Sequence, residues 1–162
     1  MKLKPQTTVI ASILFVVAGI LGSMALGWWQ TESDKVPQRL ETAAASGEEG
    51  AYDPADIRGS YTLGEISSFF EIPVEELASA FIIEQGDAAA FKVKELETIY
   101  TDPASEVGTS SMRLFVAWYR GLPYELKEDS FLPAPATLIL REKAKLTPEQ
   151  EEYLETHTLA AP

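Results

Sequence analysis

The sequence contains no cysteine and a single histidine among its 162 residues. Without cysteine, the chain forms no disulfide, ligates no iron–sulfur cluster through thiolates, attaches no c-type haem and offers no cysteine nucleophile. One histidine also excludes a metal site built on a histidine pair. That residue, His157, lies near the end of the chain. We expect it to be a solvated side chain or a positive charge at a helix C-terminus rather than a catalytic base.

Basic residues are also few, with 13 Lys and Arg against 25 Asp and Glu and a formal net charge of −12. Lys2 and Lys4 are the only charged residues among the first thirty, so the remainder of the chain is the acidic part. A surface this acidic repels phosphate backbones, and we therefore expect no nucleic-acid partner. Adjacent acids such as Glu75 and Glu76 are typical of solvated faces and do not by themselves indicate a catalytic carboxylate pair.

A charge-free run of 21 residues extends from Val9 to Trp29. A helix of that length spans about 30 Å, the thickness of a bilayer core. Lys2 and Lys4 precede the run, and Trp28 and Trp29 close it at the depth where aromatic side chains meet the head groups. The pattern predicts a single transmembrane helix that contacts the lipid bilayer, with the N-terminus in the cytoplasm and the rest of the chain outside.

A cleaved signal peptide is the alternative interpretation of the same run. Ser23, Met24 and Ala25 place small residues at the spacing that a signal peptidase requires, so cleavage would follow Ala25. The apolar run is longer than the roughly 7–15 residues of an ordinary signal-peptide core, which favours a retained anchor. Both interpretations place the bulk of the chain outside the cytoplasm.

Composition divides the chain into three parts: residues 1–29 as cytoplasmic stub and anchor, 30–56 as linker, and 57–162 as an extracytoplasmic domain. The stretch Glu41 to Gly50, ETAAASGEEG, has no apolar periodicity. The whole linker, residues 30–56, is therefore predicted to be a flexible acidic tether. Its 27 residues would span on the order of 30 Å.

The domain is predicted to be all-α, with several short helices. Thr62 with Glu65, and Thr147 with Gln150, form the capping-box pattern that opens a helix. Pro73 precedes the clearest amphipathic repeat, which consists of Val74, Leu77, Ala78, Phe81 and Ile82.

Three further helices are expected between these signals. Asp87 is positioned to cap one that runs to Tyr100, after the break at Gln85 and Gly86. Another begins near Thr109 or Ser110 and ends at Gly121. The prolines Pro133 and Pro135 open a helix through Arg141.

The stretch from Asp56 to about Tyr100 carries a family resemblance. Its motifs are Ile57-Arg58-Gly59, then Thr62-Leu63-Gly64-Glu65, then Ile72-Pro73-Val74-Glu75. They resemble a small helical module at the C-terminal end of membrane-bound polyferredoxin-type 4Fe-4S proteins. The cluster-binding cysteines and multiple membrane spans of those larger proteins are absent here. The resemblance implies a helical fold and a partnership with a membrane redox or respiratory complex.

The same stretch also has the layout of a helix-turn-helix, the arrangement of many DNA-binding proteins. Glu75 and Glu76 would open its second helix, where a DNA reader carries polar or basic side chains. DNA binding is therefore disfavoured.

The aromatic-rich stretch from Ser110 to Pro133 is the candidate working surface. Its proposed partner-facing residues are Arg113, Phe115, Trp118, Tyr119, Arg120 and Tyr124. One helix does not bury so many large side chains on a narrow face, so either this helix is central to the domain or part of its aromatic surface faces a partner.

The sequence predicts a non-enzymatic, membrane-anchored accessory subunit without a cofactor. Its helical head would dock on a membrane-associated or extracytoplasmic protein complex. The alternative is a small-ligand-binding or enzymatic head that uses its carboxylates and aromatics.

Overall fold

The computed structural model describes residues 36–40, 50–84, 86–101, 106–125 and 130–160. The chain divides into two units, Met1–Lys35 and Val36–Pro162, and only the second contains described residues. The predicted anchor, with Lys2, Lys4, Trp28 and Trp29, lies outside them. Within the described ranges, no helix combines the length and apolarity needed to cross a membrane.

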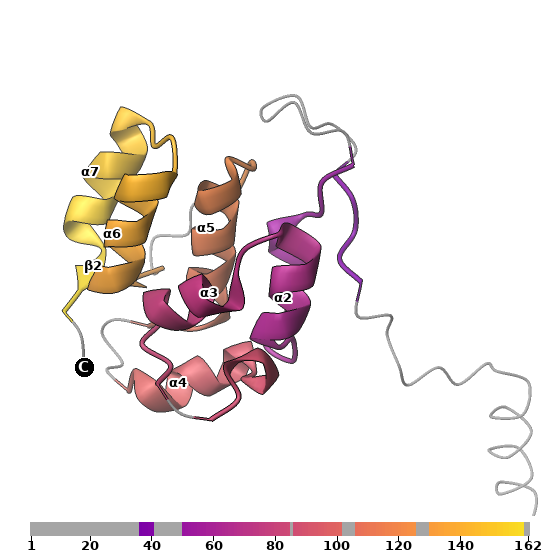
Figure 1. Cartoon of the computed structure of the whole chain (residues 1–162). Helices are drawn as coiled ribbons and strands as arrows, with labels where there is room; N and C mark the ends of the chain where they lie inside the picture. The colour runs from indigo at the N-terminus through magenta and orange to yellow at the C-terminus, as the bar shows by residue number, and fades with distance from the viewer. Residues whose placement is uncertain (1–35, 41–49, 85, 102–105, 126–129, 161–162) are drawn as a thin grey trace, which may run out of the picture. The chain divides into compact units, whose positions relative to one another are not determined.

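The second unit is mostly helical, as the sequence predicts (Figure 1). Its α-helices are α2 (Leu63–Phe70), α3 (Val74–Ala80), α4 (Leu96–Ile99), α5 (Thr109–Arg120), α6 (Ala134–Lys143) and α7 (Pro148–Thr156). Short 3-10 turns accompany them: η1 (Pro54–Asp56), η2 (Ala88–Ala90) and η3 (Val93–Glu95).

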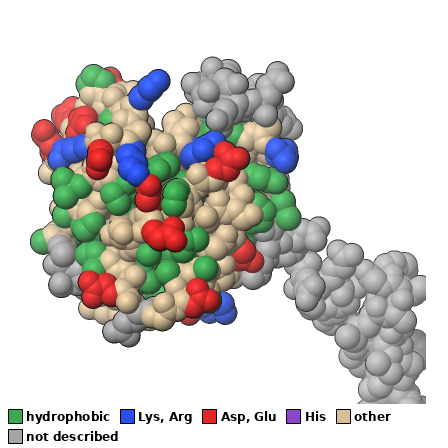
Figure 2. All heavy atoms as spheres, in the orientation of Figure 1, with side chains coloured by type: hydrophobic (Ala, Val, Ile, Leu, Met, Phe, Trp, Pro, Cys, Tyr) green, Lys and Arg blue, Asp and Glu red, His purple; other side chains and the backbone are tan. Residues whose placement is uncertain are grey.

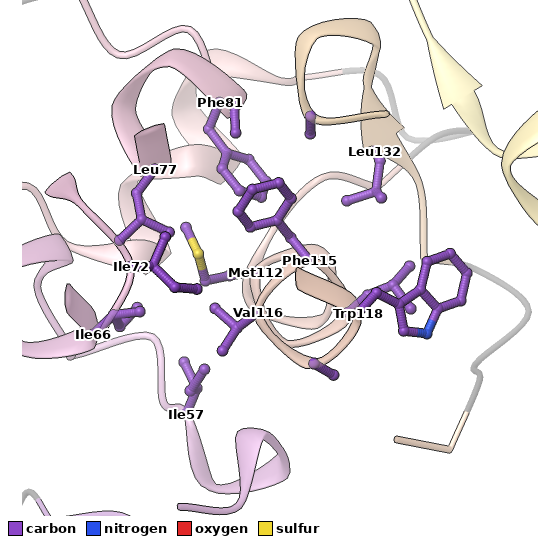
Figure 3. Packing of buried hydrophobic residues seen from close by; sticks show 14 of the residues in the cluster. Ile57, Ile66, Ile72, Leu77, Phe81, Met112, Phe115, Val116, Trp118 and Leu132 are labelled. Atoms are coloured by element: carbon purple, nitrogen blue, oxygen red, sulfur yellow. The ribbon is translucent and has the colours of Figure 1, made fainter. Parts of the chain in front are cut away.

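The longest helix of the described residues, α5, forms the centre of the domain. In Figure 1 it lies between α6 and α7 on one side and α2 on the other. Ser111, Met112 and every residue from Leu114 to Trp118 are buried. Figure 3 shows these side chains leaving α5 in several directions, with Met112 beside Ile72 and Phe115 against Phe81. A helix buried on most of its surface explains why its sequence is apolar over so wide a face.

The predicted capping boxes are present. The Thr62 hydroxyl accepts from the Glu65 amide over 3.2 Å, and a Glu65 carboxylate oxygen accepts from the Thr62 amide over 2.8 Å. Thr147 and Gln150 form the same reciprocal pair at the start of α7. These bonds satisfy amides that the first turn of a helix leaves unpaired.

The expected helix from Asp87 to Tyr100 is broken into three short pieces. Asp87 caps η2 rather than an α-helix, and its carboxylate accepts from the Ala89 amide over 3.1 Å. Residue Phe91 then lies in extended conformation, and its carbonyl accepts from the Leu63 amide over 3.0 Å. This tertiary bond to the start of α2 outweighs the helical pattern at that point.

Part of the segment predicted as linker packs on the domain. Arg39 and Tyr52 form an antiparallel bridge, and backbone bonds of 2.9 and 2.8 Å join Leu40 to Ala51 and Asp53 to Gln38. Tyr52 lies edge-on to Phe69, with ring centroids 5.2 Å apart. We call residues 36–40 and 50–53 the N-terminal clasp. Leu40, Ala51 and Tyr52 all pack against the hydrophobic core, and these contacts hold the clasp on the domain.

A minimal parallel pairing joins the end of the chain to α6. The strands β1 (Leu132–Pro133) and β2 (Thr158–Leu159) each have two residues. The Leu132 amide donates to the His157 carbonyl over 2.9 Å, and the Thr137 and Thr158 hydroxyls lie 2.9 Å apart. Two-residue strands carry no recognisable alternation, so the sequence does not reveal them.

Candidate functional site

Two of the six residues expected at a partner surface belong to the core. Phe115 is fully buried, edge-on to Phe81 with ring centroids 5.6 Å apart. Trp118 is 4% exposed and lies edge-on to Tyr153 at the same centroid separation. The prediction that Phe115 and Trp118 face a partner is therefore wrong. Central packing, the other interpretation of the aromatic stretch, describes both of them.

Tyr119 and a lysine of α6 converge on one carboxylate of α3. The Tyr119 hydroxyl donates to Oε2 of Glu76 over 2.6 Å, and Lys143 pairs with Oε1. Burial raises the pKa of Tyr119 to about 12, and the hydrogen bond to Glu76 adds to that shift. At Glu76 burial raises the pKa, but the bonds from Lys143 and Tyr119 outweigh it and the net direction is downward. The cluster holds three helices together.

Arg120 and the clasp line a first cavity of about 420 Å³. We call it the Arg39–Arg120 cavity. Its walls include Tyr52, Phe69 and Glu71. Arg120 pairs with Glu71 over 3.3 Å. Arg39 donates to the Gly50 carbonyl and to the Tyr52 hydroxyl, and its guanidinium lies 4.6 Å from the centre of the Tyr52 ring.

Arg113 and Tyr124 line a second cavity of about 600 Å³. We call it the Arg113–Tyr124 cavity. The remaining lining residues are Leu40, Asp53, Ala55, Pro123 and Glu125. The volume lies within the range of about 300–1,000 Å³ that is usual for small-molecule sites.

Local structure positions the two residues for which that cavity is named. Nε of Arg113 donates to the Ile57 carbonyl over 2.7 Å, which fixes the guanidinium. Gly121 ends α5 in left-handed conformation, with φ 65°, and turns the chain so that Tyr124 lies beside the clasp. The two predicted residues thus meet at one site although they occupy different elements.

The hydroxyl of Tyr124 is buried and has no hydrogen-bond partner among the described residues. Burial raises the pKa of Tyr124, and the positive charge of Arg113 offsets part of that shift. The hydroxyl therefore keeps its proton at neutral pH and is available as a donor.

The single histidine lies at the C-terminal end of α7, one of the two settings expected for it, and is half-buried rather than simply solvated. His157 stacks on Tyr153, with ring centroids 3.9 Å apart and planes 4° apart, and Phe131 lies 5.1 Å away. No group of three or more His, Asp and Glu side chains suited to hold a metal ion occurs in the part of the chain that the structure describes.

Sequence reasoning found Arg113, Tyr119, Arg120 and Tyr124 but missed their partners. Glu76 and Lys143 are 67 residues apart, and Arg39 was placed in a flexible linker. The sequence signal for the clasp is a small set of apolar residues in the linker, Val36, Pro37, Leu40, Ala51 and Tyr52.

Scans of protein-family models, curated proteins and solved structures find no match to this chain. The resemblance to the polyferredoxin-type module stays a prediction.

Proposed function

We propose that this chain is a non-enzymatic accessory subunit, anchored in a membrane by Val9–Trp29, whose helical domain docks on a membrane-associated protein complex. The N-terminus is cytoplasmic and the domain lies outside the cytoplasm. The resemblance of Asp56 to Tyr100 to the polyferredoxin-type module makes a redox or respiratory complex the first partner to test.

The observation that carries the docking proposal is the Arg39–Arg120 cavity beside the clasp. Two arginines line it, whereas the chain as a whole is strongly acidic. Figure 2 shows acidic side chains distributed over one face of the domain, with most of the visible Lys and Arg in its upper half. Arginine beside aromatic side chains is the composition that protein-binding surfaces favour.

The absence of cysteine makes the topology directly testable. Single-cysteine variants of the full chain, Gln6→Cys and Ser68→Cys, are treated in intact cells with a membrane-impermeant maleimide. Labelling of Ser68→Cys alone, with Gln6→Cys labelled only after lysis, supports the proposed orientation. The opposite pattern overturns it. The mass of the purified wild-type chain then separates a retained anchor from cleavage after Ala25.

Docking is tested by site-specific photocrosslinking in the cells that produce the protein. A photoreactive amino acid replaces Ser68, which is exposed at the rim of the Arg39–Arg120 cavity, or Lys145, which is exposed and lines neither cavity. The proposal expects one discrete membrane-protein adduct from position 68, lost when Arg120→Glu is added, and none from position 145. Identical adducts from both positions, or none from position 68, would count against docking through this surface.

A further inference from the structure

The Arg113–Tyr124 cavity has features of a ligand site that are independent of the anchor. Opposite charges line it without neutralising one another. Among the described residues, Arg113 forms no ion pair with Asp53 or Glu125, although all three line the same space. These three charged residues remain unpaired with one another around a cavity large enough for a small molecule.

The hydrogen-bonding capacity of the cavity is incompletely used. Only Nε of Arg113 is occupied by the protein, at the Ile57 carbonyl, and its two terminal nitrogens have no partner in the described ranges. The Tyr124 hydroxyl is buried and also unpartnered there. A buried donor without an acceptor is unfavourable, so this arrangement favours a bound group that accepts from both residues.

A carboxylate meets that requirement. Its two oxygens accept from the planar fork of an arginine and from a hydroxyl at the same time. A doubly charged phosphate would face the same donors, but it would also face Asp53 and Glu125 in the same cavity, and like charges raise the free energy of binding.

Asp53 and Glu125 indicate that the ligand also carries a positively charged group. One oxygen of Asp53 accepts from the Ala55 amide over 2.8 Å, and its other oxygen has no partner among the described residues. Glu125 is exposed at the rim. An ammonium group satisfies these oxygens. Leu40, Ala55 and Pro123 complete the lining with apolar surface.

We propose that the Arg113–Tyr124 cavity binds a free α-amino acid, with its carboxylate at Arg113 and Tyr124, its ammonium at Asp53 and Glu125, and an apolar side chain against Leu40 and Pro123. The proposal goes beyond docking, because it assigns a small ligand to a separate cavity. A peptide presents only one of the two charged groups at either terminus, so the free amino acid is distinguished from a peptide by chemistry.

The test is isothermal titration of the full-length purified chain with the common α-amino acids. The ligand that binds best is then compared with its N-acetyl derivative, its carboxamide and the acid that lacks the amino group. The proposal expects binding by at least one apolar amino acid and a loss of about tenfold or more for each derivative, because each removes one charge-assisted contact. No binding by any amino acid at 10 mM, or equal binding by the derivatives, overturns it.

Three variants locate the site. Tyr124→Phe removes only a buried, unpartnered hydroxyl, so it should leave the melting temperature unchanged or raise it, and it should weaken binding by about fivefold or more. Asp53→Asn retains an oxygen for the Ala55 amide and should abolish the preference for the amino acid over its deaminated analogue. Arg120→Gln, in the other cavity, is the control and should bind as the wild type does. Wild-type affinity in Tyr124→Phe and Asp53→Asn, or an equal loss in Arg120→Gln, contradicts the assignment.

Discussion

Tyr119 donates a hydrogen bond of 2.6 Å from its hydroxyl to Oε2 of Glu76, and so joins the central helix α5 to α3. The acceptor is a carboxylate that also pairs with Lys143 of α6. Hydrogen bonds to charged groups contribute about 1.5–3 kcal/mol, roughly twice the value for neutral pairs. This cluster is therefore the strongest polar connection that we identify among the three helices.

Tyr119→Phe should lower the free energy of unfolding by about 1–2 kcal/mol, because the carboxylate loses one of its two donors while the ring remains. Tyr100→Phe is the matched control, since it removes a bond of 3.1 Å to the neutral carbonyl of Phe81 and should cost less. Urea unfolding of the full chain measures both. If Tyr119→Phe costs as much in a Glu76→Gln background as in the wild type, the two residues are not coupled.

The pKa of Glu76 gives a pH dependence with a definite sign. Its folded-state pKa lies below the ordinary value of 4.5, because the bonds from Lys143 and Tyr119 outweigh the effect of burial. The resulting stabilisation is complete above 4.5 and is lost as the pH falls through the lowered folded-state pKa.

Glu76→Gln should consequently be less stable than the wild type at neutral pH, and the difference should shrink as the pH falls below 4.5. Unfolding titrations at a series of pH values measure this difference. Glu151→Gln, which removes the partner of the exposed Arg141, is the control and should cost less stability at neutral pH. A constant difference between wild type and Glu76→Gln across the acid range would contradict the assignment.

The assignment of Phe115 to the core predicts a large effect on stability. Phe115→Ala should lower the free energy of unfolding by about 3–5 kcal/mol, since the side chain is fully buried against Phe81. Leu138→Ala on α6 is the control, because Leu138 is 65% exposed and should change stability by less than about 0.5 kcal/mol. If Phe115→Ala changed stability as little as Leu138→Ala, the assignment of Phe115 to the core would be contradicted.

The helices were predictable from sequence where capping and amphipathic patterns agree. Thr62 and Thr147 are the N-caps of α2 and α7, as the capping-box pattern predicts, and Gly121 ends α5 as expected. The stretch after Asp87 was not predictable, because the backbone there bonds to residues far away in the sequence, as Phe91 does to Leu63. Local pattern carries no information about such partners.

The candidate site was only half predictable for the same reason. The arginines and aromatics of α5 stand out in the sequence, but the structure divides them between the core, the Glu76 cluster and two cavities. Clasp residues line both cavities, and the clasp is held by contacts of Leu40, Ala51 and Tyr52 with the core, which the composition of the segment does not indicate.

Hydrogen exchange provides a test of the clasp. The amides of Leu40 and Asp53 donate to Ala51 and Gln38, so both should exchange more slowly than unprotected amides in the full-length chain. Tyr52→Ala removes the aromatic contact and should speed exchange at both, while the Leu63 amide, bonded to Phe91, stays protected. Fast exchange at Leu40 and Asp53 in the wild type would show that the clasp does not form.

The turn that delivers Tyr124 to its cavity depends on Gly121. Its φ of 65° is left-handed, and an added Cβ would meet no heavy atom within 4 Å, so a substitution there costs backbone strain alone. Gly121→Ala should lower the free energy of unfolding by about 1–2 kcal/mol, and Gly121→Asn by less, because asparagine tolerates this conformation better.

Gly59 offers the opposite case and serves as the control for the turn. A Cβ there would lie 3.1 Å from Cβ of Lys94 and 3.2 Å from the Thr109 hydroxyl, while the backbone conformation is ordinary. Gly59→Ala should therefore destabilise by crowding, and Gly59→Asn should be worse rather than better. Urea unfolding of the four variants shows, at each position, whether alanine or asparagine is the more destabilising substitution. Asparagine that fails to improve on alanine at position 121 would mean that crowding, not backbone strain, requires glycine at the end of α5.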